Sequence, residues 1–383
     1  MSKEKDRHIQ DEKSIPERDF HAQHHSHSEE GSIRGDFKRR KDEDRHWHRS
    51  KNLPFYPPKI DNHLLEKFYV ITVISNPIRY KSRYNLYQKF RQHVLDLGGK
   101  LITVELAFGN RGFQITDRDN PFHVQLRTDQ ELWHKENAIN VGINYLSQLD
   151  PDWQYVAWID ADIHFSRNDI FLETIQQLQH YEIVQMFSHA IDLNPNEEPI
   201  ATHNGFMWSY LQNDRYPPQG PGQGGYYNQS KGFWHPGYAW AAKRRALDKL
   251  PLLEHAAMGA GDHHMALSLI GCAEKSLPGG ISKGYRHAVM NWQHVALSEY
   301  RKNVGYVPGT LMHSWHGRKA DRKYKERWDI LTKNNFDPYT DLVKDSQGLH
   351  KLNMNYGERS IRIRDDFRAY FRQRSEDDLY TGD

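Results

Sequence analysis

The stretch "YVAWIDADIHF", residues 155–165, is apolar until it reaches two carboxylates, Asp160 and Asp162. A short apolar run bounded by polar residues is typical of a buried strand. An Asp-x-Asp pair alone is a weak signal, because most such pairs are solvated turn residues. Its place directly after a buried strand is more informative, since ligands of α/β proteins bind at the carboxyl ends of the strands.

Similar strands precede this one, and helical patterns lie between them. "FYVITVI" (68–74) and "LITVELAF" (101–108) read as buried strands. Between them, Leu86, Phe90 and Val94 recur every four residues, which predicts a helix. Strands that alternate with helices indicate a mainly parallel, three-layer α/β sheet.

Two further helices are predicted from capping-box patterns. Thr128 and Glu131 would open a helix through "ELWHKENAINVGINYL" (131–146). Ser166 and Asp169 repeat the pattern after the strand that ends in the two aspartates. In such a sheet Asp160 and Asp162 lie at a strand end, where two hard oxygen ligands suit a divalent cation that bridges phosphates.

The composition limits the classes of protein to consider. The chain has 383 residues, 12% of them aromatic, which is enough for a substantial core. A single cysteine, Cys272, excludes an intrachain disulfide, no apolar run approaches the length of a membrane span, and the first residues carry no apolar signal core. We therefore expect a cytoplasmic protein without a membrane span. The net charge of +2 gives no global attraction to nucleic acid.

The chain divides by composition into three parts. Residues 1–52 are dense in charged residues and histidine and nearly free of aliphatic ones, which predicts a disordered, mixed-charge tail. Its "HAQHHSHS" (21–28) could bind a transition metal, although a solvated low-complexity segment is the favoured interpretation. We expect one globular domain at 53–340 and a helical, charged extension at 341–383.

The second half of the chain supplies further polar residues at element ends. "GYVPGTLMHSWHG" (305–317) reads as a strand that ends in His313 and His316, two imidazoles three residues apart. In "AAMGAGDHHMALSLIG" (256–271), a glycine turn presents Asp262 at the start of an apolar helix, either as an N-cap or as a base that faces a ligand. The Gly/Pro-rich segment 217–240 contains Trp234 and is either a lid or an excursion.

The order of these motifs resembles the metal-dependent GT-A glycosyltransferases, most closely the beta-1,4-galactosyltransferase group, from about residue 68 to 316. The family's Pro-x-Arg nucleotide loop is matched by Pro77 and Arg79 in "NPIRY", and its uridine-facing acid by Glu105. Lys135, followed by "NVG", stands where the family has an arginine, so it offers the nucleotide only a point charge. The remaining matches are "DAD" (160–162), "GAGDHH" (259–264) and the closing pair His313 and His316.

The resemblance implies transfer of a sugar from a nucleotide-diphosphate sugar, a UDP-sugar for this group, to an acceptor hydroxyl with inversion. Asp162, His313 and His316 would be the metal ligands, and their mixed oxygen and nitrogen atoms favour Mn²⁺ over Mg²⁺. Asp160 would hold hydroxyls of the donor. Since His263 stands where the family has an acid, the base is either Asp262 or His263. The lack of an anchor fits a cytosolic bacterial or phage-type member.

The acceptor and two other classes of function stay open. The basic segment "HGRKADRKYKERW" (316–328) is by default a solvated helix face, or else contacts a polyanionic acceptor. Such an acceptor would be a glycan or, with a low prior, DNA with hydroxylated bases. A nucleotidyltransferase could use the Asp-x-Asp but does not need the histidine pair. An inactive nucleotide- or glycan-binding module would not need all of Asp160, Asp162, Asp262, His313 and His316.

Overall fold

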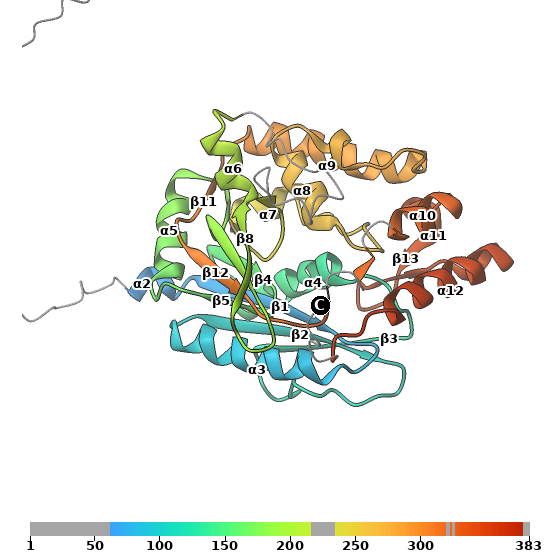
Figure 1. The fold of residues 1–383 in the computed structure, drawn as a ribbon, viewed down its shortest axis with the longest axis horizontal. Coiled ribbons are helices and arrows are strands. Elements are labelled where there is room, and N and C mark those ends of the chain that lie inside the picture. The colour runs from blue at the N-terminus through green and yellow to red at the C-terminus, as the bar shows by residue number, and fades with distance from the viewer. Residues whose placement is uncertain (1–61, 216–233, 319–321, 324–325, 378–383) are drawn as a thin grey trace, which may run out of the picture. The chain divides into compact units, whose positions relative to one another are not determined.

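A computed structural model describes residues 62–215, 234–318, 322–323 and 326–377 (Figure 1). The tail predicted at 1–52 and most of the Gly/Pro-rich segment lie outside these residues. No helix in the described ranges combines the length and apolar character needed to cross a bilayer.

The central sheet is mixed but mainly parallel, as the sequence predicts. Its strands lie in the order β11 (Val304–Tyr306), β6 (Ile183–Gln185), β10 (Ala239–Lys243), β4 (Tyr155–Ile159), β1 (Phe68–Ser75), β2 (Lys100–Phe108) and β3 (His123–Thr128). Strand β10 runs antiparallel to both of its neighbours, β4 and β6, and the other pairs are parallel. The α/β prediction is therefore confirmed.

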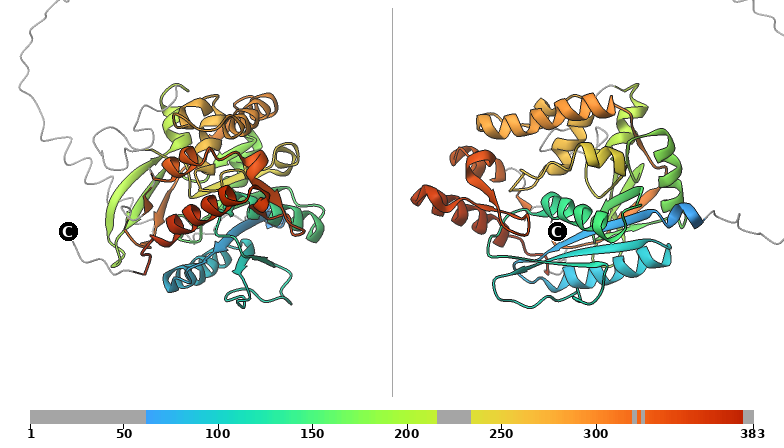
Figure 2. Two further views of the ribbon diagram at one scale, coloured as in Figure 1. Left: turned by 90° about the vertical axis from the view of Figure 1, so that its right-hand side faces the viewer. Right: turned by 180° about the vertical axis from the view of Figure 1, so that it is seen from behind.

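Helices cover both faces of this sheet, which gives the predicted three layers. Side chains of β1 alternate between two cores: Phe68 and Val70 pack on one face, Tyr69 and Ile71 on the other. The first face is covered by α3 (Lys81–Asp96) and α5 (Ile170–His180). The other is covered by α4 (Lys135–Leu149), α6 (Phe206–Gln212), α7 (Arg244–Lys249), α8 (Gly261–Leu269) and α9 (Lys283–Tyr300). Figures 1 and 2 show α3 and α4 on opposite sides of β1.

A second sheet, not predicted from the sequence, lies next to the first. Its order is β5 (Ile163–Phe165), β12 (Thr310–His313), β7 (His189–Leu193), β8 (Pro199–Gly205) and β9 (Trp234–His235). The single strand predicted over 305–317 is wrong, because the chain leaves the first sheet after β11 and enters the second at β12. Pro308 has no N–H to donate to a ladder, so the strand is interrupted there. His313 ends β12, and His316 follows it.

Neither capping box forms, although both helices exist. Helix α4 begins at Lys135, after His134, rather than at Glu131. The Thr128 hydroxyl accepts a bond from the amide of Gln130, and Glu131 pairs with arginines of α12, so neither side chain reaches the helix start. Helix α5 likewise receives no side-chain cap from Asp169, whose carboxylate binds Arg167.

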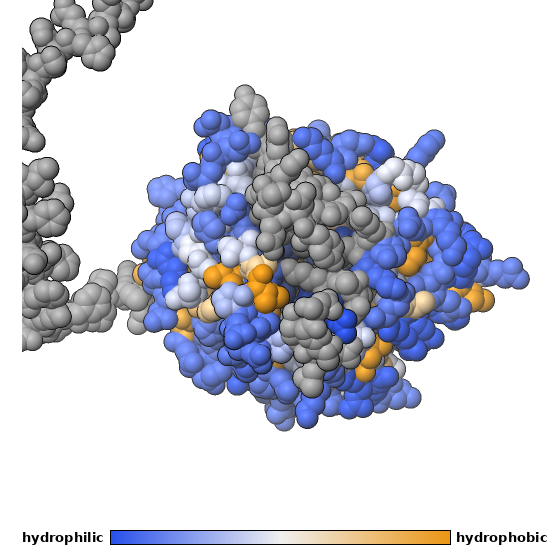
Figure 3. All heavy atoms as spheres, viewed as in Figure 1, coloured by the Kyte–Doolittle hydropathy of each residue, from blue (hydrophilic) through white to orange (hydrophobic). Residues whose placement is uncertain are grey.

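The remaining elements come from the C-terminal part and one short helix at the start. They are α2 (Asn62–Leu65), the 3-10 helices η4 (Ala273–Ser276) and η6 (Met354–Tyr356), α10 (Glu326–Lys333), α11 (Pro338–Asp341), α12 (Glu358–Arg372) and the hairpin β13 (Leu342–Lys344) with β14 (His350–Leu352). Phe336 and Phe367, from either side of the boundary expected at 340, share one core with α4. In Figure 3, hydrophobic residues on the visible face form small groups among hydrophilic ones.

Candidate active site

Asp160 and Asp162 lie in the turn between β4 and β5, at the carboxyl end of the parallel strands. The amide of Asp160 donates to the carbonyl of Tyr238, 2.8 Å away, and the amide of Ser314 donates to the carbonyl of Asp162, also 2.8 Å away. These backbone bonds tie the turn to the residue before β10 and to the segment after β12. The aspartates and the histidine pair are thereby held at one place.

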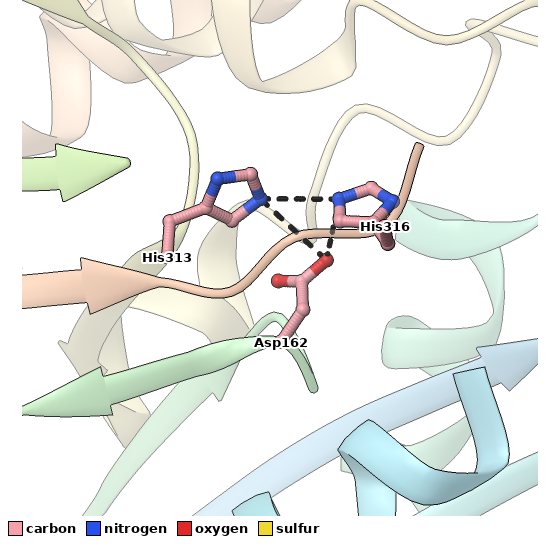
Figure 4. A group of neighbouring side chains, drawn as sticks. All are labelled: Asp162, His313 and His316. Carbon is pink, nitrogen blue, oxygen red and sulfur yellow. Dashed lines mark hydrogen bonds and ion pairs between the residues drawn. The ribbon is translucent and has the colours of Figure 1, made fainter. Parts of the chain in front are cut away.

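Asp162, His313 and His316 converge, as Figure 4 shows. His316 Nε2 lies 3.1 Å from Asp162 Oδ2 and 3.1 Å from His313 Nε2, and His313 Nε2 lies 3.8 Å from Asp162 Oδ2. One donor atom from each residue lies within 4.8 Å of the others. Asp162 Oδ1 is buried and has no hydrogen-bond partner among the described residues. This set of one carboxylate and two imidazoles fits a divalent transition ion.

The charges of this triad depend on burial and on the mutual contacts. Burial alone would raise the pKa of Asp162, but His316 and His313 outweigh it and hold that pKa well below its ordinary value. Burial also opposes the charge on His313, yet Asp162 and Asp192 raise the pKa of that imidazole to about 9. Burial and Arg322 lower the pKa of His316 to about 4. Asp162 is therefore ionised and the His316 imidazole is neutral at pH 7, as ligands must be, whereas His313 carries a proton that a bound ion would have to displace.

The guanidinium of Arg322 faces the same nitrogen that would bind an ion. Arg322 Nη2 lies 2.9 Å from His316 Nε2. A cation bound by the triad would therefore have to move this guanidinium away from His316.

Lys135, the first residue of α4, lies among carboxylates beside the triad. Its ammonium pairs with Asp160. Burial works against the charge, but Asp160, Asp262 and Glu136 together raise the pKa of Lys135 above its ordinary value. Burial raises the pKa of Asp160 despite the attraction of Lys135. The lysine is thus a fixed cation that connects the Asp-x-Asp turn to the candidate base.

Glu136 is a buried carboxyl beneath this cluster. Trp133 Nε1 donates to Glu136 Oε2 over 3.0 Å. Burial raises the pKa of Glu136 to about 7, with Asp262 adding to the effect and Lys135 opposing it.

Glu136→Gln should therefore change how the stability of the protein depends on pH. The pKa of Glu136 is higher in the folded protein than in the unfolded chain, so its protonation stabilises the fold. This stabilisation is complete below the pKa of the unfolded chain, about 4.3, and is lost as pH rises through about 7. Glutamine stays neutral, so the variant should gain on the order of 2 kcal/mol relative to wild type between pH 5 and pH 8. Urea unfolding at both pH values measures this, with Glu358→Gln, at an exposed position, as control. If the free energies of unfolding of the variant and of wild type differ by the same amount at pH 5 and at pH 8, the prediction is contradicted.

The glycine turn before α8 places Asp262 and His263. Gly259 and Ala260 have φ values of 89° and 78°, and α8 begins at Gly261 with Ala260 as N-cap. The N-cap interpretation of Asp262 is therefore wrong, because Asp262 already lies inside the first turn. A Cβ on Gly261 would lie 2.6 Å from Cδ of Glu136, so only glycine fits there without displacing that carboxyl.

Two ring nitrogens beside this turn have no hydrogen-bond partner among the residues that the structure describes. The imidazole of His263 stacks on the indole of Trp234, with centroids 5.7 Å apart and planes 6° apart. His263 Nε2 and Trp234 Nε1 are buried and find no hydrogen-bond partner in the described part of the chain. Burial lowers the pKa of His263 to about 4, although Asp262 opposes this shift. A ligand with hydroxyl groups could satisfy both nitrogens.

These groups line a single cavity of about 520 Å³. Its wall includes, from the predicted site, Pro77, Lys135, Asp160, Asp162, Asp262, His263, His313 and His316. Arg322, Lys323 and Arg327 of the basic segment also line it. Arg322 and Arg327 are half-buried, so the interpretation of that segment as a solvated face does not hold for these two, whereas Lys323 is exposed. The cavity thus combines the triad, several cations and the candidate bases.

Arg79 and Glu105 are not among the residues that line this cavity. Arg79 is exposed, and its guanidinium lies 3.4 Å from Gln114 Oε1. The buried carboxylate of Glu105 accepts bonds from the amides of Gln114, Ile115 and Thr116 and from the Thr116 hydroxyl. In the structure Glu105 therefore fixes this loop instead of facing the cavity.

Three residues that the sequence did not single out surround the triad: Arg83, Asp192 and Glu376. Arg83 lines the cavity beside Asp162. Asp192 on β7 lies behind His313, and Glu376, after α12, lies beside His316. Each is an ordinary charged residue in the sequence, far from the residues it contacts, so no local pattern could have identified it.

No family model and no curated protein matches this chain. Among solved structures, it is similar to the catalytic domain of Drosophila beta1,4galactosyltransferase 7 in complex with xylobiose, at 10% identity and a TM-score of 0.34, over 76% of this chain and 96% of that one. It is also similar to a glycosyltransferase involved in the glycosylation of the major capsid of PBCV-1, at 8% identity and a TM-score of 0.27, over 70% of this chain and 98% of that one.

A further similar structure is 4-diphosphocytidyl-2C-methyl-D-erythritolsynthase from Anaerococcus prevotii DSM 20548, at 10% identity and a TM-score of 0.28, over 65% of this chain and 90% of that one. At identities and TM-scores this low, none of these similarities supports a function for this chain. The function proposed next rests on the residues of the cavity.

Proposed function

We propose that this protein is a metal-dependent glycosyltransferase with the GT-A fold, which moves a sugar from a UDP-sugar to an acceptor hydroxyl with inversion. The observation that carries the proposal is the convergence of Asp162, His313 and His316 at the carboxyl end of a mainly parallel sheet, on the wall of a cavity of about 520 Å³. Two imidazoles with one carboxylate favour Mn²⁺ over Mg²⁺, which prefers oxygen ligands.

In this reaction the acceptor oxygen forms a bond to the anomeric carbon while the bond from that carbon to the diphosphate breaks. The diphosphate leaves with the bonding electron pair, and the proton of the acceptor passes to Asp262 or His263. The bound divalent ion would neutralise charge on the leaving diphosphate as a Lewis acid. Lys135 and the cations of the basic segment would add to this from the cavity wall.

The remaining residues are assigned to the donor and the acceptor by their place in the cavity. Asp160 and Pro77 are proposed to contact the donor, together with Lys135. The ring nitrogens of Trp234 and His263, which have no partner in the described part of the chain, suit sugar hydroxyls, since a hydroxyl can both accept from the indole and donate to the imidazole. The acceptor is a glycan or another hydroxyl-bearing polymer, and Arg322, Lys323 and Arg327 would favour one that carries negative charge.

Product analysis of the full-length chain tests this function. With Mn²⁺ and a panel of nucleotide sugars, mass spectrometry should detect slow release of UDP from one UDP-sugar, and chelation should stop it. Release of pyrophosphate from a nucleoside triphosphate and a sugar phosphate would instead identify a nucleotidyltransferase. Binding of nucleotide without any product would identify a binding module. Either result would overturn the proposal.

A further inference from the structure

Each imidazole of the triad has a buried carboxylate on the side away from Asp162. His313 Nδ1 lies 2.8 Å from Asp192 Oδ1, and the Asp192 side chain is 2% exposed. His316 Nδ1 lies 3.9 Å from Glu376 Oε2, and the Glu376 side chain is 4% exposed. Both histidines thus have a buried carboxylate behind Nδ1, from β7 and from the segment after α12; the one at His313 is within hydrogen-bond distance and the one at His316 lies further away.

We propose that Asp192 and Glu376 are positioning residues of the metal site, so that the segment after α12 completes this site. The inference rests on the metal site of the proposed function. A carboxylate beside Nδ1 favours the tautomer that carries its proton there, which leaves the lone pair of Nε2 to the ion. It also fixes the rotation of the ring, so that Nε2 stays directed toward Asp162.

Asp192 is held in place by a buried network. The hydroxyl of Tyr238 donates to Asp192 Oδ1 over 3.1 Å, and His203 Nε2 contacts Asp192 Oδ2. Tyr238 is the residue whose carbonyl accepts from the amide of Asp160. The network therefore joins the ring of His313 to the turn that carries the Asp-x-Asp pair.

Glu376 reaches His316 because the segment 374–377 is anchored on both sides. Asp377 accepts from the amides of Lys81 and Ser82, at 2.9 and 2.8 Å, at the start of α3. Ser375 packs against Gly317, the residue after His316. A Cβ on Gly317, whose φ is 90°, would lie 2.7 Å from the carbonyl oxygen of Ser375. Glycine at 317 is thus required for this close approach beside a ligand.

The same carboxylate fixes a cation on the cavity wall. Arg83 Nη2 donates to Glu376 Oε1 over 2.6 Å, its Nε contacts Glu376 Oε2, and its Nη1 donates to the carbonyl of Ser75 over 2.6 Å. Because Arg83 lines the cavity, Glu376 also sets the direction of a guanidinium that an anionic donor would meet. Loss of Glu376 should therefore weaken the binding of UDP as well as that of Mn²⁺.

Titration of Mn²⁺ into the full-length protein, followed by the EPR signal of the free ion, tests the proposal without enzyme turnover. We expect Glu376→Gln and Asp192→Asn each to weaken Mn²⁺ binding by about 10- to 100-fold. Asp365→Asn, an exposed acid-to-amide change on α12, should bind as wild type does. Urea unfolding of each variant separates lost affinity from lost folding.

Glu376→Gln leaves Arg83 without its carboxylate partner, and this could prevent folding. A second variant is designed for that case. The double variant Arg83→Gln with Glu376→Gln removes the Arg83 guanidinium together with its carboxylate, so that the arginine that loses a partner is Arg374, which pairs with Glu376 over 3.5 Å. This double variant should still bind Mn²⁺ more weakly than Arg83→Gln alone. The inference is overturned, while the metal site stands, if the double variant and Arg83→Gln bind Mn²⁺ with equal affinity. It is also overturned if Glu376→Gln and Asp192→Asn both bind Mn²⁺ as wild type does. Tighter Mn²⁺ or UDP binding by Glu376→Gln would also overturn it, because Glu376 would then compete with the ligands. Wild-type protein that binds no Mn²⁺ would end both this inference and the metal part of the proposed function.

Discussion

Asp162→Ala should reduce sugar transfer by at least about 10³-fold and should abolish measurable Mn²⁺ binding. Asp162 supplies the only carboxylate of the triad, and its Oδ2 lies 3.1 Å from His316 Nε2. Without it, two imidazoles remain to hold a divalent ion with no ligand charge. The fold should persist, because the Asp162 side chain is 24% exposed and lies outside both hydrophobic cores.

Initial rates at saturating donor over a range of Mn²⁺ concentrations measure this effect. His316→Ala should give the same result, because it removes a neutral ligand of the same ion. Asp152→Ala, an 85% exposed acid just before β4, is the matched control and should keep the wild-type rate. If transfer proceeds unchanged in a chelator and in both triad variants, the metal site has been assigned to the wrong residues.

The second large effect is expected at the glycine turn. Asp262→Asn keeps the shape of the side chain but cannot take up the acceptor's proton, so transfer should fall by about 10²- to 10⁴-fold while Mn²⁺ and UDP still bind. His263→Gln should cost much less if Asp262 is the base. Rates at saturating donor, with the acceptor varied, give kcat and KM separately for both variants.

The opposite result would exchange the two roles. If His263→Gln is inactive and Asp262→Asn only raises the acceptor KM, then His263 is the base and Asp262 contacts the acceptor. Near-normal rates in both variants would leave direct displacement without a base at this turn. A histidine base with an ordinary pKa would lose activity as pH falls through about 6.5. Burial lowers the pKa of His263 to about 4, so a His263 base should instead stay active down to about pH 5.

The structure also shows why some sequence predictions succeeded and others did not. The strands at 68–74, 101–108 and 154–159 were predicted because continuous apolar runs mark strands buried on both faces. The capping box predicted from Thr128 and Glu131 does not form, because these side chains bind other partners. Thr128 binds within the loop before α4, and Glu131 binds an arginine of α12. Glu105 was interpreted as facing the nucleotide, but it lies inside β2, and the loop that follows this strand takes up its carboxylate.

The sequence by itself determined the alternation of strands and helices, the mainly parallel sheet, and the polar residues at the ends of β4 and β12. These features are local: apolar periodicity records which face of an element is buried, and residues next to a strand end share its position in the sheet. The tertiary structure alone decided the antiparallel course of β10, the second sheet that the chain enters at β12 and the partners of the histidines. Asp192 meets His313 across 121 residues, and Arg83 meets Glu376 across 293. Such contacts depend on how whole layers pack, and no pattern of neighbouring residues records that.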